Sequence, residues 1–212
     1  MKLFCRRLFS VVLTLFLCLQ AQAQHVIFPQ ETQPGEAVAN KSEGTYTLQN
    51  ALFTAKFILA DGKLTFGGCE ELNLIAGSEI FKVQLGNGTE IPATEFTLVG
   101  DIEIEDLAGD YAAVKGAHRF AGKQIVANFT HESGLAIQWR AVLRDGSHYL
   151  RTEMDIKNPG TDGIAMNSIT PMIYTVQNED GVKAPTVVGN TRGAVIASDK
   201  LFAGVEIGRA HV

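Results

Sequence analysis

The segment around Glu103, Glu105 and Asp106 holds three closely spaced carboxylates, a side-chain type that can act as an acid, a base or a nucleophile. Chemistry of that kind needs two carboxylates held at a fixed separation in a pocket. An acidic run flanked by turn residues is more often a solvated strand edge, and no pattern brings two of these groups into one pocket. We therefore predict no catalytic residue at these positions or elsewhere in the chain.

The thiol and imidazole groups also lack the spacing that chemistry would require. Cys69 has no histidine close to it in the sequence, and a free cysteine is usually a small buried apolar residue, so we predict a packing role rather than a nucleophile. Metal sites show short ligand spacings, whereas the histidines stand singly at His25, His118, His131 and His148. We predict no metal and no cofactor, and the sequence assigns no substrate-binding residue.

A hairpin around Asp145-Gly146 is the most informative part of the chain, because it sorts polar side chains from apolar ones. Pairing about this turn places four mostly apolar pairs on one face, namely Leu143 with His148, Ala141 with Leu150, Trp139 with Thr152 and Ile137 with Met154. The other face pairs Arg144 with Ser147, Val142 with Tyr149, Arg140 with Arg151 and Gln138 with Glu153. This alternation predicts a strand pair with one face in the core and one outside.

The directly opposed Arg140 and Arg151 are unusual, since like charges across a strand pair destabilise it unless a third group intervenes. Glu153 is the expected third group. The polar face is interpreted either as an ordinary solvated ion-pair surface or as a charged platform for a sugar or for carboxylates of a neighbouring domain.

The elements around this hairpin predict an all-β fold. Short runs rich in Val, Ile, Phe and Thr begin near Thr45, and no window sustains a helical stripe. Turn dipeptides that indicate hairpins separate these runs at Asp61-Gly62, Asn87-Gly88, Ser133-Gly134, Asp145-Gly146 and Pro159-Gly160. So many strands need a second layer to cover their apolar faces, which predicts a large antiparallel β-sandwich over residues 45–206.

The N-terminus has the features of an export signal. A basic start is followed by an apolar run of about a dozen residues and an Ala-Gln-Ala site, so residues 1–23 are predicted to be a signal peptide. The run falls short of the roughly 20 residues of a membrane-spanning helix. Lipoprotein processing at Cys18 is a weaker alternative. We expect a periplasmic or extracellular protein with no membrane span after cleavage, and a tether over residues 24–44 that contains Pro29 and Pro34.

Length, composition and net charge limit the folds and the partner classes that we expect for this chain. The 212 residues are fewer than the roughly 250 of a (β/α)₈ barrel, and 46% hydrophobic residues supply a core. Removing the three basic residues of the signal lowers the formal charge from −5 to −8. Nucleic acid is therefore excluded as an expected partner.

Three segments carry a resemblance to a known family: FTAKFILADGKLTFGG, GLAIQWRAVLRDGSHYLRTEMDIKNPG and VVGNTRGAVIASDKLFAGVE. In order and spacing they resemble the N-terminal, galactose-mutarotase-like β-supersandwich of secreted bacterial α-galactosidase-like glycoside hydrolases, including large proteins labelled "enterotoxin". In that family a catalytic (β/α)₈ barrel with two acidic residues follows the sandwich. The resemblance implies a glycoside hydrolase parent whose catalytic residues lie outside this chain, with carbohydrate and the catalytic domain as partners.

The last residues favour an incomplete C-terminus. Residues 207–212 read IGRAHV, which ATC GGA AGA GCA CAC GTC encodes and which resembles a sequencing adapter translated in frame. We expect these residues to be a non-native tail and the native sequence to end at Glu206.

The expected function is that of a non-catalytic N-terminal domain that supports the missing barrel and contributes to its substrate cleft. An alternative is a free-standing carbohydrate-binding or adhesin-like sandwich, which needs exposed aromatic rings. The hairpin register points the single tryptophan, Trp139, inward and disfavours that alternative. A sugar mutarotase would need a histidine and a carboxylate on one concave face, and the sequence offers no such pairing.

Overall fold

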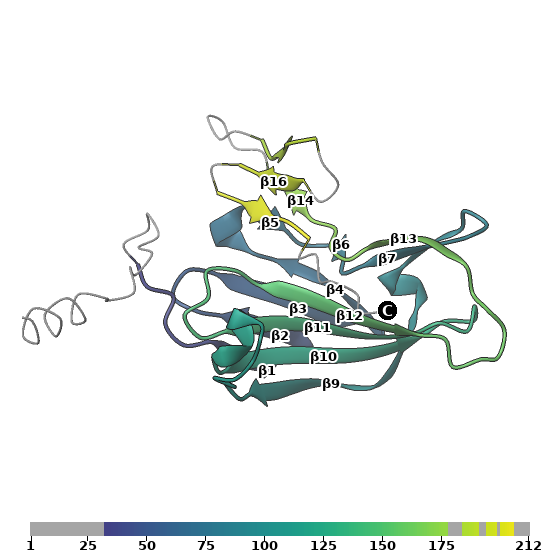
Figure 1. Ribbon diagram of the computed structural model, residues 1–212, viewed down its shortest axis with the longest axis horizontal. Coiled ribbons are helices and arrows are strands. Elements are labelled where there is room, and N and C mark those ends of the chain that lie inside the picture. Colours follow the sequence, from purple (N-terminus) through teal and green to yellow (C-terminus); the bar gives the residue numbers. More distant parts are fainter. Residues whose placement is uncertain (1–31, 178–183, 191–193, 199, 206–212) are drawn as a thin grey trace, which may run out of the picture. The chain divides into compact units, whose positions relative to one another are not determined.

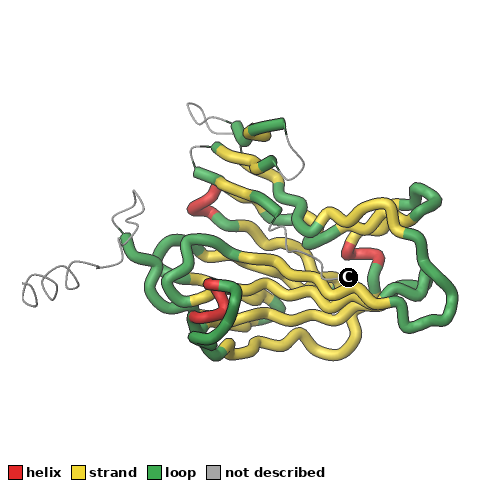
Figure 2. The backbone as a smooth tube through the Cα atoms, in the orientation of Figure 1, coloured by secondary structure: helices red, strands yellow, loops and turns green. Residues whose placement is uncertain are grey.

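The structure is a computed structural model that describes residues 32–177, 184–190, 194–198 and 200–205. The predicted signal peptide, residues 1–23, and the predicted non-native tail, residues 207–212, lie outside the described residues. The elements below all belong to the compact unit Gln33–Val212. Strands dominate that unit (Figure 2).

The first large sheet is a run of antiparallel hairpins in the strand order β1-β2-β3-β4-β6. Its strands are β1 (Val38–Ser42), β2 (Thr45–Gln49), β3 (Thr54–Ala60), β4 (Lys63–Gly68) and β6 (Ser78–Glu79). Two-residue turns with positive φ at both positions join β1 to β2 at Glu43-Gly44 and β3 to β4 at Asp61-Gly62. Such turns match the twist of the paired strands, and the second is the hairpin that the sequence predicted.

The second large sheet has the antiparallel order β12-β11-β10-β9 (Figure 1). Its strands are β9 (Thr97–Leu107), β10 (Gly122–Thr130), β11 (Ala136–Arg144) and β12 (Arg151–Lys157). Along β11 the side chains of Ile137, Trp139 and Ala141 are buried, whereas Gln138 and Arg140 are only partly so. The predicted alternation is therefore confirmed.

The two large sheets share one apolar core and form an antiparallel β-sandwich. The indole of Trp139 on β11 meets the ring of Phe57 on β3 edge to face, with ring centroids 5.1 Å apart. Phe57 also packs against Phe66 of β4. Burying a side chain of this size contributes about 1.5–3 kcal/mol, so these rings are a main source of stability for the sandwich.

Smaller sheets and three short 3₁₀ helices complete the described fold. A three-stranded sheet has the order β13-β7-β8, with β7 (Lys82–Leu85), β8 (Glu90–Pro92) and β13 (Met166–Thr170), and β5 (Leu74–Ile75) pairs with β14 (Thr175–Val176). A further sheet contains β15 (Thr186–Val188), β16 (Val195–Ala197) and β17 (Phe202–Ala203). The 3₁₀ helices are η1 (Glu70–Leu72), η2 (Ala93–Glu95) and η3 (Gly116–Arg119).

The sandwich starts earlier than the sequence predicted. Residues 24–44 were expected to form a tether, but β1 lies within that range and pairs along its whole length with β2. Four of the five β1 residues are exposed, so this edge strand lacks the apolar face that makes a strand recognisable in a sequence. Residues before it are also fixed, since the backbone N–H of Ala37 donates to Asp145 Oδ1 at 2.8 Å.

One predicted hairpin is absent. The Pro159-Gly160 turn follows β12, but the next strand, β13, pairs with β7 instead of returning along β12. Turn residues mark where a strand ends without specifying its next partner. Within the described part of the chain, no helix has the length and apolar character needed to cross a membrane.

Candidate functional site

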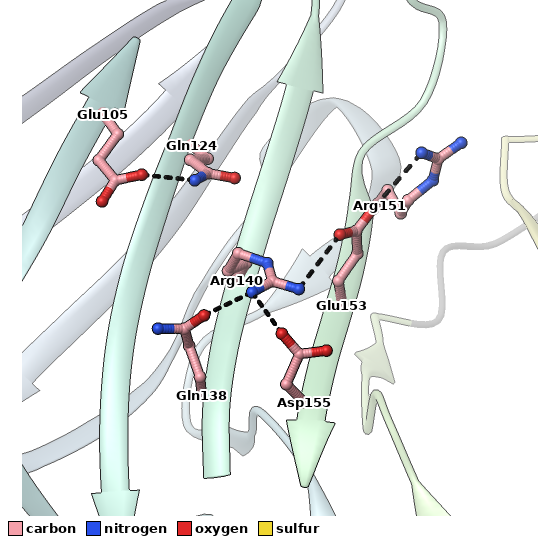
Figure 3. Close-up of polar contacts among 7 residues, drawn as sticks. All are labelled: Glu105, Gln124, Gln138, Arg140, Arg151, Glu153 and Asp155. Carbon is pink, nitrogen blue, oxygen red and sulfur yellow. Dashed lines mark hydrogen bonds and ion pairs between the residues drawn. The ribbon is translucent and has the colours of Figure 1, made fainter. Parts of the chain in front are cut away.

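The outward surface of the β9–β12 sheet, here called the outer face, carries a connected set of polar side chains. Alternate residues of each strand point away from the core. The outer-face residues used below are Glu105, Gln124, Gln138, Arg140, Val142, Arg151, Glu153 and Asp155. Figure 3 shows the polar members of this set on four adjacent strands.

Arg140 is the centre of the network. Its Nη1 donates to Gln138 Oε1 at 2.6 Å and to Asp155 Oδ2 at 2.8 Å, and its Nη2 lies 3.5 Å from Glu153 Oε2 (Figure 3). Only 18% of the side chain is exposed. The hydrogen bond with Asp155 raises the pKa of Arg140 and, reciprocally, lowers the pKa of Asp155. Both groups are therefore charged at neutral pH, and their mutual orientation is fixed.

Arg151 extends the network to an aromatic ring. Its Nη1 lies 3.5 Å from Glu153 Oε1, and its Nη2 donates to the hydroxyl of Tyr149 at 3.3 Å. The guanidinium also lies over the Tyr149 ring, 5.8 Å from the centroid. Tyr149 itself is 53% exposed. A half-exposed ring thus stands at the end of a row of linked charged groups.

The hairpin register differs from the predicted one by two residues. Arg140 lies opposite Glu153, and Arg151 lies opposite Val142, so the predicted opposition of Arg140 and Arg151 is wrong. The connection is a longer loop, residues 145–150, in which Gly146 donates its backbone N–H to Gly35 at 2.8 Å. A shift of two residues preserves which side chains share a face, because the side-chain period of a strand is two.

The predicted role of Glu153 is confirmed, since its two carboxylate oxygens lie near the two different arginines. Arg140 and Arg151 both keep a small exposed fraction, 18% and 12%. Arg140 binds Asp155 in addition. The positive charges of the network are therefore largely balanced by carboxylates of the same chain.

A loop at the end of the same sheet displays aromatic side chains that sequence reasoning missed. Residues 108–121 connect β9 to β10, and within them Tyr111 is 91% exposed and Phe120 is more than half exposed. Arg144 holds both ends of this loop by donating from Nη1 to the carbonyls of Phe120 at 2.8 Å and Ala108 at 3.3 Å. Desolvation lowers the pKa of Arg144. The signal available in the sequence was aromatic residues set among turn formers, whereas our prediction weighed only the tryptophan.

The acidic segment of β9 divides its three carboxylates between the two faces of the strand. Glu105 accepts a hydrogen bond from Gln124 Nε2 at 2.6 Å on the outer face, and Asp106 forms an ion pair with Lys123. Glu103 and Glu105 alternate along the outer face, opposite Val126 and Gln124, whereas Asp106 points to the other face. The contacts of Glu105 and Asp106 fit ordinary strand ion pairing.

Cys69 is buried, as predicted, and its thiol donates to Glu71 Oε2 at 3.4 Å. Burial raises the pKa of the Cys69 thiol to about 12, so the nucleophilic thiolate is not populated at neutral pH. Burial likewise raises the pKa of Tyr174 well above its usual range. These shifts belong to packed core groups and not to an activated nucleophile.

Among the histidines named in the sequence analysis, His131 has a structural role. The Nδ1 of His131 accepts the backbone N–H of Ser133 at 3.0 Å, which stabilises the turn between β10 and β11. His118 lies in η3, and His25 lies outside the described residues. No group of three or more potential metal ligands occurs among the residues that the structure describes.

The sheet of β15, β16 and β17 exposes several large apolar side chains. Val187 and Ile196 lie opposite each other on one face of this sheet, here called the apolar surface, whereas Val188 and Phe202 are exposed on its other face and Val205 follows β17. Leu201, by contrast, packs against the main core. The segment therefore has one anchor in the core and a set of apolar groups turned to solvent.

Comparison of the chain with models of protein families, with curated proteins and with solved structures finds no match.

Proposed function

We propose that this chain is a non-catalytic β-sandwich domain of an exported carbohydrate-active protein of the α-galactosidase-like glycoside hydrolase class, and that it packs against a neighbouring catalytic domain. Support for the carbohydrate class comes from the resemblance of the three segments quoted above. Support for a packing role comes from the apolar surface on β15, β16 and β17, which is the observation that carries the proposal.

The energetic reason is the cost of leaving such side chains in water. Covering a Val, Ile or Phe side chain contributes about 1.5–3 kcal/mol, and large apolar patches on a protein surface usually mark an interaction site. Interfaces between domains of one chain commonly bury about 600–1,500 Å². Val187 and Ile196, paired on one face of the small sheet, supply an apolar centre for such an interface.

A non-catalytic role agrees with the contacts of the acidic residues. Retaining glycoside hydrolysis requires two carboxylates about 5–5.5 Å apart, and inverting hydrolysis about 6.5–9.5 Å, on either side of the bond to be cleaved. Two carboxylates of the outer face, Glu153 and Asp155, both contact Arg140. The hydrogen bond from Arg140 lowers the pKa of Asp155, whereas a general acid needs a raised pKa.

The proposal predicts that the purified chain self-associates through the apolar surface. Sedimentation velocity across a concentration series would measure this for the unmodified chain and for the double variant Val187→Ser, Ile196→Ser. We expect reversible oligomers for the unmodified chain and a monomer for the double variant. Val114→Ser is the control, because Val114 is an even more exposed valine that lies in the 108–121 loop, and it should associate like the unmodified chain.

A monomeric unmodified chain, or equal association of all three proteins, would contradict the packing role. The same preparations should hydrolyse neither aryl α-glycosides nor aryl β-glycosides. Turnover that disappears when one carboxylate of residues 45–206 is changed would show that the sandwich itself is the enzyme.

A further inference from the structure

We propose that the outer face of the β9–β12 sheet binds an uncharged glycan chain, with Tyr149 as the stacking ring and with Arg140 and Glu153 among the hydrogen-bonding groups. The choice of carbohydrate rests on the proposed function, whereas the location and the uncharged character of the ligand come from the contacts on this face.

The charge balance of the face favours an uncharged ligand. Arg140 and Arg151 are matched by Glu153 and Asp155, with N–O distances from 2.8 to 3.5 Å. An anionic ligand would have to compete with these carboxylates for the guanidinium groups, and a cationic ligand would have to compete with the arginines. A polyhydroxyl ligand can accept from the guanidinium groups and donate to the carboxylates at the same time, without breaking the ion pairs.

The polar groups are also pre-oriented. Arg140 has three partners and Glu153 contacts two arginines, so neither side chain needs to be ordered when a ligand arrives. Ordering a long flexible side chain costs about 0.5–1.5 kcal/mol in a binding reaction, and a fixed network avoids much of that cost. Asp155 remains about half exposed, which leaves its carboxylate accessible from solvent.

Tyr149 supplies the apolar contact. Its ring is 53% exposed, its hydroxyl accepts from Arg151, and its backbone carbonyl accepts from Ser147 Oγ at 2.8 Å. An exposed aromatic ring that is held in place can stack on the C–H face of a sugar ring at little entropic cost. Its position next to Arg151 places stacking and hydrogen bonding side by side, as recognition of a sugar requires.

The experiment is affinity electrophoresis of the folded chain in native gels that contain guar galactomannan, barley mixed-linkage β-glucan or polygalacturonate. Retardation of the unmodified chain measures its dissociation constant for each polymer. The variants are Tyr149→Ala and Glu153→Gln, with Tyr111→Ala as the matched control, because it removes an exposed tyrosine from a different loop. Urea unfolding of each variant reports whether its fold is retained.

We expect retardation by at least one of the two uncharged polymers. The dissociation constant should change little between 50 and 500 mM NaCl, because salt screens interactions between charges and these polymers carry none. Tyr149→Ala should weaken this binding about tenfold or more and Glu153→Gln about fivefold, whereas Tyr111→Ala should stay within about twofold. These losses should appear in variants whose unfolding midpoints remain near that of the unmodified chain.

Three results would overturn the proposal. The first is the absence of retardation by both uncharged polymers. The second is salt-sensitive binding of polygalacturonate alone, which would assign the face to an acidic partner. The third is equal loss of binding in Tyr111→Ala and Tyr149→Ala, which would move the site to the loop end. None of these results depends on self-association or turnover. Failure of glycan binding can therefore be distinguished from failure of the proposed packing role.

Discussion

Trp139 is the largest side chain that is fully buried, and its contact with Phe57 joins the two sheets at the middle of the core. Changing Trp139 to Ala should therefore destabilise the protein by about 3–5 kcal/mol, the range for deletion of large aromatic groups from cores. Urea unfolding followed by circular dichroism would measure the change. Thr130→Ala, on an exposed position of the neighbouring strand β10, is the control and should cost less than about 0.5 kcal/mol. A loss below 1 kcal/mol for Trp139→Ala would contradict the central role of this ring.

The buried thiol of Cys69 should make the stability of the folded chain depend on pH. Its pKa is raised by burial to about 12 in the folded chain, against about 8.5 in an unfolded chain. The stability that the buried neutral thiol confers is fully present below about pH 8.5 and is lost as the pH rises toward the folded value, because only the unfolded state ionises in that window. The urea midpoint of the unmodified chain should fall more steeply above pH 8.5 than that of Cys69→Ala.

Labelling with iodoacetamide gives an independent check on Cys69. At pH 8 the folded chain should react much more slowly than the chain in urea, because the thiol is both buried and protonated. Equal labelling rates in the two states, or parallel pH profiles for the unmodified chain and Cys69→Ala, would show that this thiol is accessible.

At the scale of the elements, Gly122 determines how closely β10 approaches β11. A methyl group at this position would overlap the carbonyl oxygen of Leu143 and lie 2.8 Å from the Cα of Arg144. Gly122→Ala should therefore cost about 1–3 kcal/mol through overpacking. Gly116→Ala is the matched control, since a methyl group there has no neighbour within 4 Å. Equal unfolding midpoints for the two variants would contradict the close approach of these strands.

The sequence predicted those features of the sheets that depend on local pattern. The alternation of Ile137, Trp139 and Ala141 has the period of a strand and requires no knowledge of the partner strand. The Asp61-Gly62 turn was predictable for a similar reason, because a two-residue hairpin needs positive φ at both positions. All-β architecture and the inward position of Trp139 follow from such local signals.

The features that the sequence did not predict depend on contacts between distant residues. The loop after β11 takes its length from hydrogen bonds of Asp145 and Gly146 to residues 35 and 37, and no local pattern contains that information. As a result Arg140 was paired with Arg151 instead of Glu153. Strand β1 was missed because an exposed edge strand has no apolar stripe, and the exposed ring of Tyr149 depends on the conformation of the same loop.

At the scale of the whole molecule, the proposed account combines a well-packed sandwich with two surfaces of different character. The outer face of β9–β12 is polar and charge-balanced, and the sheet of β15–β17 presents apolar side chains. The charged groups of the outer face are paired with one another, so this surface needs no further partner to balance its charge. Apolar exposure on the second is costly unless another domain covers it, and this difference is the basis for proposing that the chain works beside a catalytic partner.

The most direct test of that claim is the nucleotide sequence of the gene that encodes this chain. The account predicts that the same gene encodes a (β/α)₈ barrel of roughly 250 residues, with two carboxylates at the carboxyl ends of its strands. A gene that encodes no such barrel together with this chain would contradict its proposed role as the supporting domain of a glycoside hydrolase.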